Sequence, residues 1–165
     1  MSSWRYCVDT SALIDLNYLY PRSVFATLWR SLERLVEEGR LIAPSDVLEE
    51  LKRGDDDLTE WAKKQRRMFR TQDAKLLREV SAILKVVPDL ADATRTRPVH
   101  ADPFVVALAQ IEHQHAQTEL LLAGCTVVCH EGRRGQRLRI PDACDRLGIE
   151  CIRFQALFKR EGWSF

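Results

Sequence analysis

The chain has 165 residues, of which 45% are hydrophobic and 30% are charged, so it can bury a sizeable core. Its 25 basic and 24 acidic residues give a net charge of +1. These values argue against a disordered chain and against a protein that holds nucleic acid by its overall charge. They favour one domain over residues 1–165.

Nothing in the sequence predicts a leader peptide or a membrane anchor. The first five residues, MSSWR, lack a basic start followed by a long apolar segment. No apolar run approaches the roughly 20 residues that a membrane span needs. We therefore expect a cytoplasmic protein without membrane association.

The five cysteines favour the same compartment. An odd number with no Cys-x-x-Cys spacing indicates reduced thiols rather than a disulfide framework. Cys125, Cys129 and His130 lie close enough in the sequence to raise the question of a zinc site. No second ligand pair follows them, so cysteines of a buried strand are the favoured interpretation.

Short apolar runs alternate with helical patterns along the first half of the chain. Strands are predicted at residues 6–8 and 41–43, and helices over 10–17, 23–38 and 46–53. Helical spacing continues over 57–70, where Asp57 and Glu60 resemble a capping box, and then over 72–84. We therefore expect a helical insertion at about 55–90 that forms a lobe or lid.

The second half of the chain repeats this alternation. A helix is predicted from Asp102, the expected N-cap before Pro103, to about residue 123, with a break near Gln114. After it come a strand at 126–129, a basic loop at 132–139, a helix at 141–147, a strand at 149–154 and a helix at 156–161. Short apolar strands alternating with helices predict an α/β fold, with a parallel sheet covered on both faces.

Four acidic residues follow the predicted strands in a regular way. Asp9 ends the first strand, Glu50 lies on the helix after the second, Asp102 begins a later helix and Glu131 follows the next strand. In a right-handed α/β fold these positions share the carboxyl edge of the sheet. Clustered carboxylates repel one another unless a cation lies among them, and hard oxygen ligands suit Mg²⁺ or Mn²⁺. The pattern indicates a metal-dependent phosphoryl-transfer or nuclease site.

Each acid alone also has an ordinary explanation. Asp9 and Asp102 would serve as helix caps, Glu50 as a solvated helix residue and Glu131 as a loop acid. The order and context of the four together are more specific than any single position.

Four segments of the chain resemble the PIN domain, a nuclease superfamily that includes the VapC toxins. They are VDTSALI at 8–14, VLEEL at 47–51, ADPFVVALA at 101–109 and TVVCHE at 126–131. The closing pieces, IPDAC at 140–144 and GIECI at 148–152, resemble a prokaryotic PIN-like branch of unknown function. The resemblance covers nearly the whole chain and implies a three-layer α/β/α sandwich around a central parallel sheet.

The resemblance also implies an activity, namely an endoribonuclease that depends on Mg²⁺ or Mn²⁺. It implies three metal ligands, Asp9, Glu50 and Asp102. Glu49 is the alternative to Glu50, but the family's acid directly precedes a leucine, as Glu50 does here.

The fourth catalytic acid departs from the family pattern. That acid is usually an aspartate after the strand, and this chain has Glu131 there, with Asp142 in reserve. The longer side chain leaves one metal or two as alternatives.

Substrate contacts are expected near these acids. Ser11 would orient a ligand or a water, and Arg133, Arg134 and Arg137 in the basic loop would bind RNA phosphates. A solvated charged face is an equal alternative for the loop.

The resemblance implies an RNA substrate, an antitoxin protein as partner and a homodimer. The alternative function is a non-catalytic PIN-like module that binds RNA or protein, favoured by the altered fourth acid and the near-neutral charge. A dehalogenase-like phosphatase with Asp9 as nucleophile fits poorly, because it needs a second acid where this chain has Ser11.

Overall fold

The centre of the fold is a five-stranded parallel sheet. The computed structural model of the chain describes residues 4–54, 56–91, 100–118, 123–131 and 138–165. The strand order is β3-β2-β1-β4-β5, and all four neighbouring pairs are parallel. The strands are β1 (Arg5–Val8), β2 (Leu41–Pro44), β3 (Phe69–Arg70), β4 (Cys125–Val128) and β5 (Cys151–Ile152).

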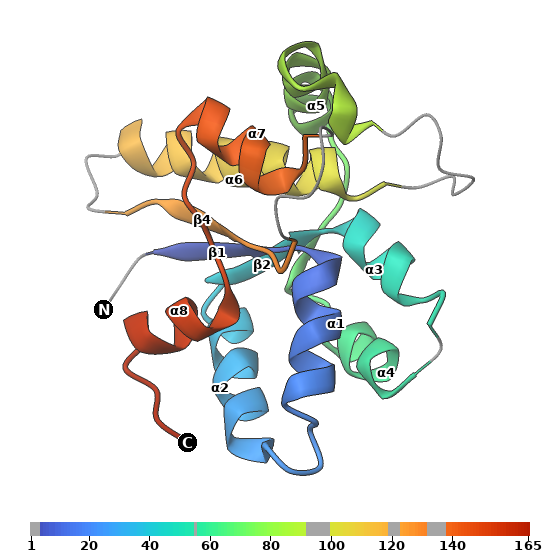
Figure 1. Cartoon of the computed structure of the whole chain (residues 1–165), viewed down its shortest axis with the longest axis vertical. Helices are drawn as coiled ribbons and strands as arrows, with labels where there is room; N and C mark the ends of the chain where they lie inside the picture. The colour runs from blue at the N-terminus through green and yellow to red at the C-terminus, as the bar shows by residue number, and fades with distance from the viewer. Residues whose placement is uncertain (1–3, 55, 92–99, 119–122, 132–137) are drawn as a thin grey trace.

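Helices cover both faces of this sheet, so the predicted three-layer α/β/α architecture is confirmed (Figure 1). One face carries α5 (Ala74–Val86), α6 (Asp102–Thr118) and α7 (Ile140–Leu147). The other carries α1 (Thr10–Leu19), α2 (Ala26–Glu37), α4 (Asp57–Lys64) and α8 (Phe154–Arg160). Helix α3 (Ser45–Leu51) continues directly from β2, and a 3₁₀ turn at Pro88–Leu90 follows α5.

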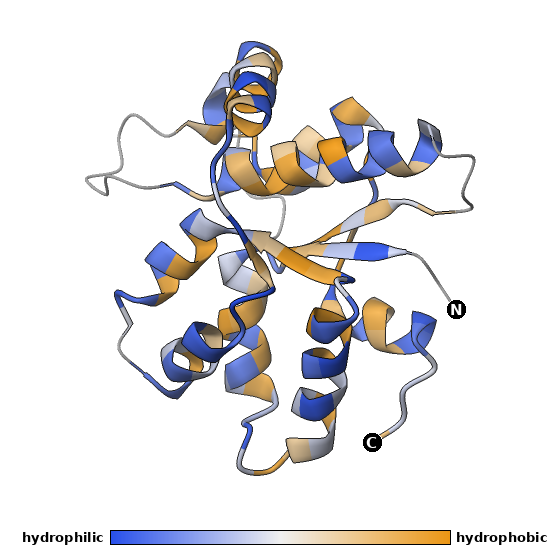
Figure 2. Cartoon of the chain, turned by 180° about the vertical axis from the view of Figure 1, so that it is seen from behind, coloured by the Kyte–Doolittle hydropathy of each residue, from blue (hydrophilic) through white to orange (hydrophobic). Residues whose placement is uncertain are grey.

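The sequence forms this fold because its central strands consist mostly of apolar residues. Every residue of β2 and β4 is buried, as expected for strands that lie between two helical layers. The helices turn apolar faces toward the sheet and polar faces outward (Figure 2). None of the helices in the described part of the chain is long and apolar enough to cross a membrane.

The predicted helix over residues 57–70 is wrong beyond residue 64. Helix α4 ends at Lys64, and Phe69 and Arg70 form a parallel edge strand against Ala43 and Pro44 of β2. A strand of two residues is too short to show alternation in the sequence, so it cannot be told from the helical spacing that precedes it. The capping box is also wrong, because α4 is capped by the carboxylate of Asp56, which accepts from the Thr59 N–H at 2.9 Å.

The segment predicted as a helical insertion therefore also supplies the edge of the sheet. Its second helix, α5, packs on α6.

Other element boundaries shift by a few residues. Pro44 lies inside β2 rather than after it, and α6 passes Gln114 without a break to Thr118, where the described residues stop. Strand β5 is shorter than predicted, because Phe154 already belongs to α8.

A candidate metal centre

Three of the four predicted acids meet beyond the carboxyl ends of the central strands. Asp9, Asp102 and Glu131 each offer one carboxylate oxygen, and these oxygens lie within 4.8 Å of one another. Asp9 directly follows β1, and Glu131 follows the end of β4. Because Val8 and Val128 are paired in register, the two acids leave the sheet side by side. Asp102 joins them from the first turn of α6.

Asp9 is held firmly and is almost fully buried, with 2% of its surface exposed. Its N–H donates to the Val128 carbonyl at 2.9 Å, and the Ser11 hydroxyl donates to its Oδ2 at 2.7 Å. Burial and the negative charges of Glu131 and Glu50 raise the pKa of Asp9 to about 6, although the hydrogen bond from Ser11 acts to lower it. The site therefore disfavours an ionised Asp9 unless a positive charge is present.

Two buried carboxylate oxygens of this group have no hydrogen-bond donor among the described residues. They are Oδ1 of Asp9 and Oε2 of Glu131. Buried polar atoms are nearly always paired, so two orphaned oxygens in one cluster indicate a missing partner. Hard carboxylate oxygens are the ligands that Mg²⁺ and Mn²⁺ prefer, and the residues therefore fit a divalent cation.

Glu50 lies beside the cluster but uses both of its oxygens locally. Oε2 accepts from the Thr10 hydroxyl at 2.5 Å, and Oε1 accepts from the Ala101 N–H at 3.0 Å. Its charge still acts on the pKa of Asp9, so it is a near neighbour of the site. Glu50 thereby ties the start of α1 to the residue before Asp102. Its role as a metal ligand stays a prediction.

The start of α6 differs by one residue from the prediction. Asp102 is the first helical residue rather than the N-cap. The carbonyl of Ala101 accepts from the Val105 N–H at 2.9 Å, so Ala101 occupies the N-cap position. Its own N–H donates to Glu50, and the carboxylate of Asp102 is placed with the other acids.

The reserve acids have structural roles. Glu49 is exposed and pairs with Lys52 at 2.7 Å, and Asp142 accepts from the Arg139 N–H at 2.9 Å at the start of α7. Arg133, Arg134 and Arg137, predicted to bind RNA, lie outside the described residues.

Sequence reasoning missed three residues around the acids. Thr10 donates to Glu50, and Asp15 Oδ2 lies 3.2 Å from Nε2 of His130. The N–H of His130 donates to Ser11 Oγ at 3.3 Å. One signal was available, because Asp15 is four residues after Ser11 and so shares its face of α1.

The cysteines form no disulfide, and all but Cys151 are fully buried. Cys129 Sγ lies 3.1 Å from Cys151 Sγ, and this contact, together with burial, raises the pKa of Cys129 well above its usual range. The burial of Cys125 and Cys129 agrees with the prediction that they are core residues of a strand.

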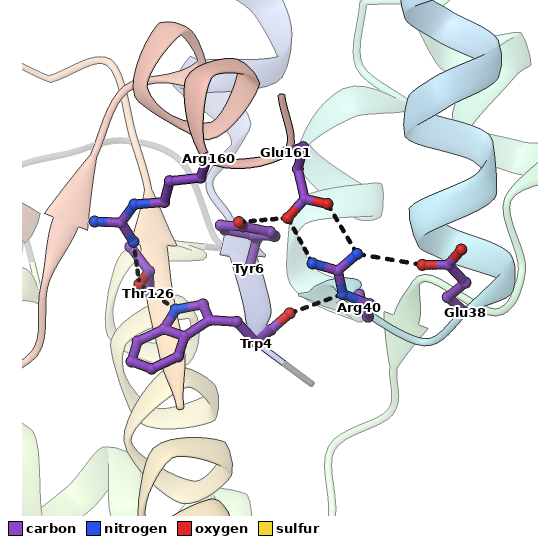
Figure 3. Close-up of polar contacts among 7 residues, drawn as sticks. All are labelled: Trp4, Tyr6, Glu38, Arg40, Thr126, Arg160 and Glu161. Carbon is purple, nitrogen blue, oxygen red and sulfur yellow. Dashed lines mark hydrogen bonds and ion pairs between the residues drawn. The ribbon is translucent and has the colours of Figure 1, made fainter. Parts of the chain in front are cut away.

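The opposite, amino edge of the sheet carries a polar network of a different kind (Figure 3). Glu161 accepts from the Tyr6 hydroxyl at 2.7 Å and from the Arg40 guanidinium at 2.5 and 2.9 Å. Arg40 also donates to the Trp4 carbonyl at 3.1 Å, and the Trp4 indole donates to Thr126 at 2.7 Å. Donors and acceptors are matched here, so the network ties the end of α8 to the sheet.

The model of a family described as a domain of unknown function, DUF4411, matches residues 6–165. No curated protein matches the chain.

Proposed function

The chain belongs to the DUF4411 family of domains of unknown function, and we propose that it is a metal-dependent endoribonuclease. One observation carries the proposal. Asp9, Asp102 and Glu131 converge at the carboxyl edge of a parallel sheet, and two of their buried oxygens have no donor among the described residues. Carboxyl edges of such sheets are where ligands bind in open α/β folds.

The residues of the site divide the work between binding and orientation. Asp9, Asp102 and Glu131 would hold Mg²⁺ or Mn²⁺, while the Ser11 hydroxyl fixes one oxygen of Asp9 and leaves the other free to bind. Glu50 adds negative charge beside them. When bound, such an ion supplies a water activated for attack and compensates the charge of the phosphodiester.

The choice of RNA rests on the PIN-like segments of the sequence. The same resemblance is our reason for proposing a toxin of the VapC type, an antitoxin protein and a second copy of the chain as partners. A cytoplasmic location is proposed from the free thiols.

The test is cleavage of a labelled single-stranded RNA with Mg²⁺ or Mn²⁺. The parent protein should cleave it, EDTA should stop the reaction, and Asp102→Asn should abolish it while the circular dichroism spectrum is unchanged. Asp57→Asn is the matched control, because Asp57 is an exposed aspartate in the first turn of α4. An Asp102→Asn variant as active as the parent would refute the assignment.

A second candidate is a non-catalytic module that binds RNA or protein. It is favoured by Glu50, whose two oxygens are both engaged and leave three acids for a cation. Calorimetry with Mn²⁺ separates the two functions, since a module without a metal site should release no binding heat that depends on Asp102.

A further inference from the structure

A chain of contacts leads from the surface of α1 to the buried acid Asp9. Nε2 of His130 lies 3.2 Å from Oδ2 of Asp15, and the His130 N–H donates to Ser11 Oγ at 3.3 Å. The Ser11 hydroxyl in turn donates to Asp9 Oδ2 at 2.7 Å. Side chain and backbone of one residue, His130, are thus both attached to α1.

This attachment matters because His130 directly precedes Glu131. One buried oxygen of the Glu131 carboxylate has no donor among the described residues, and its negative charge repels that of Asp9. Repulsion among the acids favours a position of Glu131 away from the cluster. The segment after β4, residues 129–131, must therefore be held in place by other contacts.

The geometry of the contacts suits a structural link between His130 and α1 rather than an isolated surface ion pair. Asp15 and Ser11 are one helical turn apart on α1, so both residues that contact His130 lie on the same face of this helix. The side chains of His130 and Asp15 are 30% and 39% exposed, so solvent reaches the pair but does not surround it. The contact needs only an N–H at Nε2, which a neutral imidazole can carry.

We propose that Asp15 and His130 are positioning residues that clamp the segment after β4 onto α1 and so hold Glu131 and Ser11 in place for cation binding. The clamp rests on the metal-dependent function proposed above, because it serves a cation held by Asp9 and Glu131. It adds two residues that hold the ligands without touching the ion.

A double-mutant cycle on Mn²⁺ affinity tests the clamp. Asp15→Ala and His130→Ala should each weaken Mn²⁺ binding about tenfold, the low end for residues that orient metal ligands. The double variant should also lose about tenfold, because either change alone opens the clamp. Asp15→Asn keeps an oxygen acceptor for Nε2 and should bind Mn²⁺ close to the parent. The matched control is Glu150→Ala, which removes a similarly exposed carboxylate paired with Arg160 at the amino edge.

Hydrogen exchange of the His130 amide gives a readout that needs no metal. In EDTA the amide should exchange faster in Asp15→Ala than in the parent, whereas Glu150→Ala leaves it unchanged. An unchanged rate in Asp15→Ala overturns the clamp, and so do losses of Mn²⁺ affinity that multiply in the double variant. If the parent binds no Mn²⁺, the proposed metal-dependent function fails, and the exchange rate alone then decides whether the clamp exists.

Discussion

Replacing Asp9 by asparagine should abolish cation binding and at the same time stabilise the metal-free protein. Asp9 is buried beside two other negative charges, and its pKa rises from its ordinary value of 3.8 to about 6. A carboxyl group whose pKa is raised in the folded state lowers the free energy of unfolding once it is ionised. Asparagine has nearly the same shape and carries no charge at any pH.

The magnitude follows from the shift in pKa. One pKa unit corresponds to about 1.4 kcal/mol, so ionised Asp9 costs the fold up to about 3 kcal/mol. The cost vanishes near about pH 3, where Asp9 is protonated in both the folded and the unfolded chain. It grows as the pH rises from about 4 to about 6 and is complete above that. The asparagine oxygen can still accept from Ser11, so the variant should keep this hydrogen bond while it avoids the cost of the charge.

The assay is thermal or urea unfolding in EDTA between about pH 3 and pH 8. At pH 7.5 the Asp9→Asn variant should be more stable than the parent by up to about 3 kcal/mol, which for a chain of this size raises Tm by about 6–12 °C. The two proteins should converge near about pH 3. Added Mn²⁺ should stabilise the parent and leave the variant unchanged, because a ligand stabilises only the state that binds it.

The control for this experiment is Asp73→Asn. Asp73 caps α5 through a 2.7 Å bond from the Leu76 N–H, and asparagine caps a helix about as well as aspartate. That variant should show no gain at any pH. An Asp9→Asn variant that is less stable than the parent in EDTA at neutral pH refutes the reasoning, since it would mean that the ionised carboxylate is stabilised by the apo fold.

The remaining predictions concern stability away from the candidate metal centre. Gly124→Ala should cost about 1–3 kcal/mol in urea unfolding, because the new Cβ would lie 2.6 Å from the Trp4 ring. Thr59→Val should cost about 1–3 kcal/mol, since its buried hydroxyl donates at 2.6 Å to a carbonyl in the last turn of α3 that is left without this donor. Glu161→Gln should cost about 1.5–3 kcal/mol at pH 7 by weakening the bonds from Arg40. Hydrogen bonds hold the pKa of Glu161 below 4.5 despite burial, so the cost should fade as the pH drops below that value.

Each of these has a matched control or a contradicting result. Gly54→Ala should be nearly neutral, because its nearest neighbour would lie at 3.4 Å, and equal losses at both glycines would contradict the steric argument. Thr59→Ser keeps the hydroxyl and should recover most of the stability lost in Thr59→Val. A Glu161→Gln variant whose cost does not change with pH would show that the loss comes from packing rather than from charge.

The sequence was enough to place the acids because each prediction rested on one local feature. A short apolar strand ends at Asp9, another ends just before Glu131, and a proline directly follows Asp102. The parallel sheet then brings the ends of neighbouring strands to one edge, so local features convert into a shared location. The fold class was predictable for the same reason, since alternation of buried strands and helices leaves few other architectures.

What the sequence could not show depends on contacts between distant residues. Whether Glu50 points an oxygen at a cation depends on the Thr10 hydroxyl and the Ala101 N–H, and neither pairing leaves a periodic signal. Strand β3 could not be predicted for a related reason. Its two residues form a strand only because they pair with Ala43 and Pro44 of β2.

The two edges of the sheet hold buried carboxylates in opposite electrostatic surroundings. At the amino edge Glu161 is matched by Tyr6 and Arg40, so its charge stabilises the fold. At the carboxyl edge Asp9 is buried among like charges with an oxygen unmatched in the described part of the chain, so its charge opposes the fold. Removing a buried carboxylate should therefore have opposite effects at the two edges. Such a cost is expected where the same atoms bind a ligand, so opposite signs of the change in stability would separate the proposed ligand Asp9 from the structural acid Glu161.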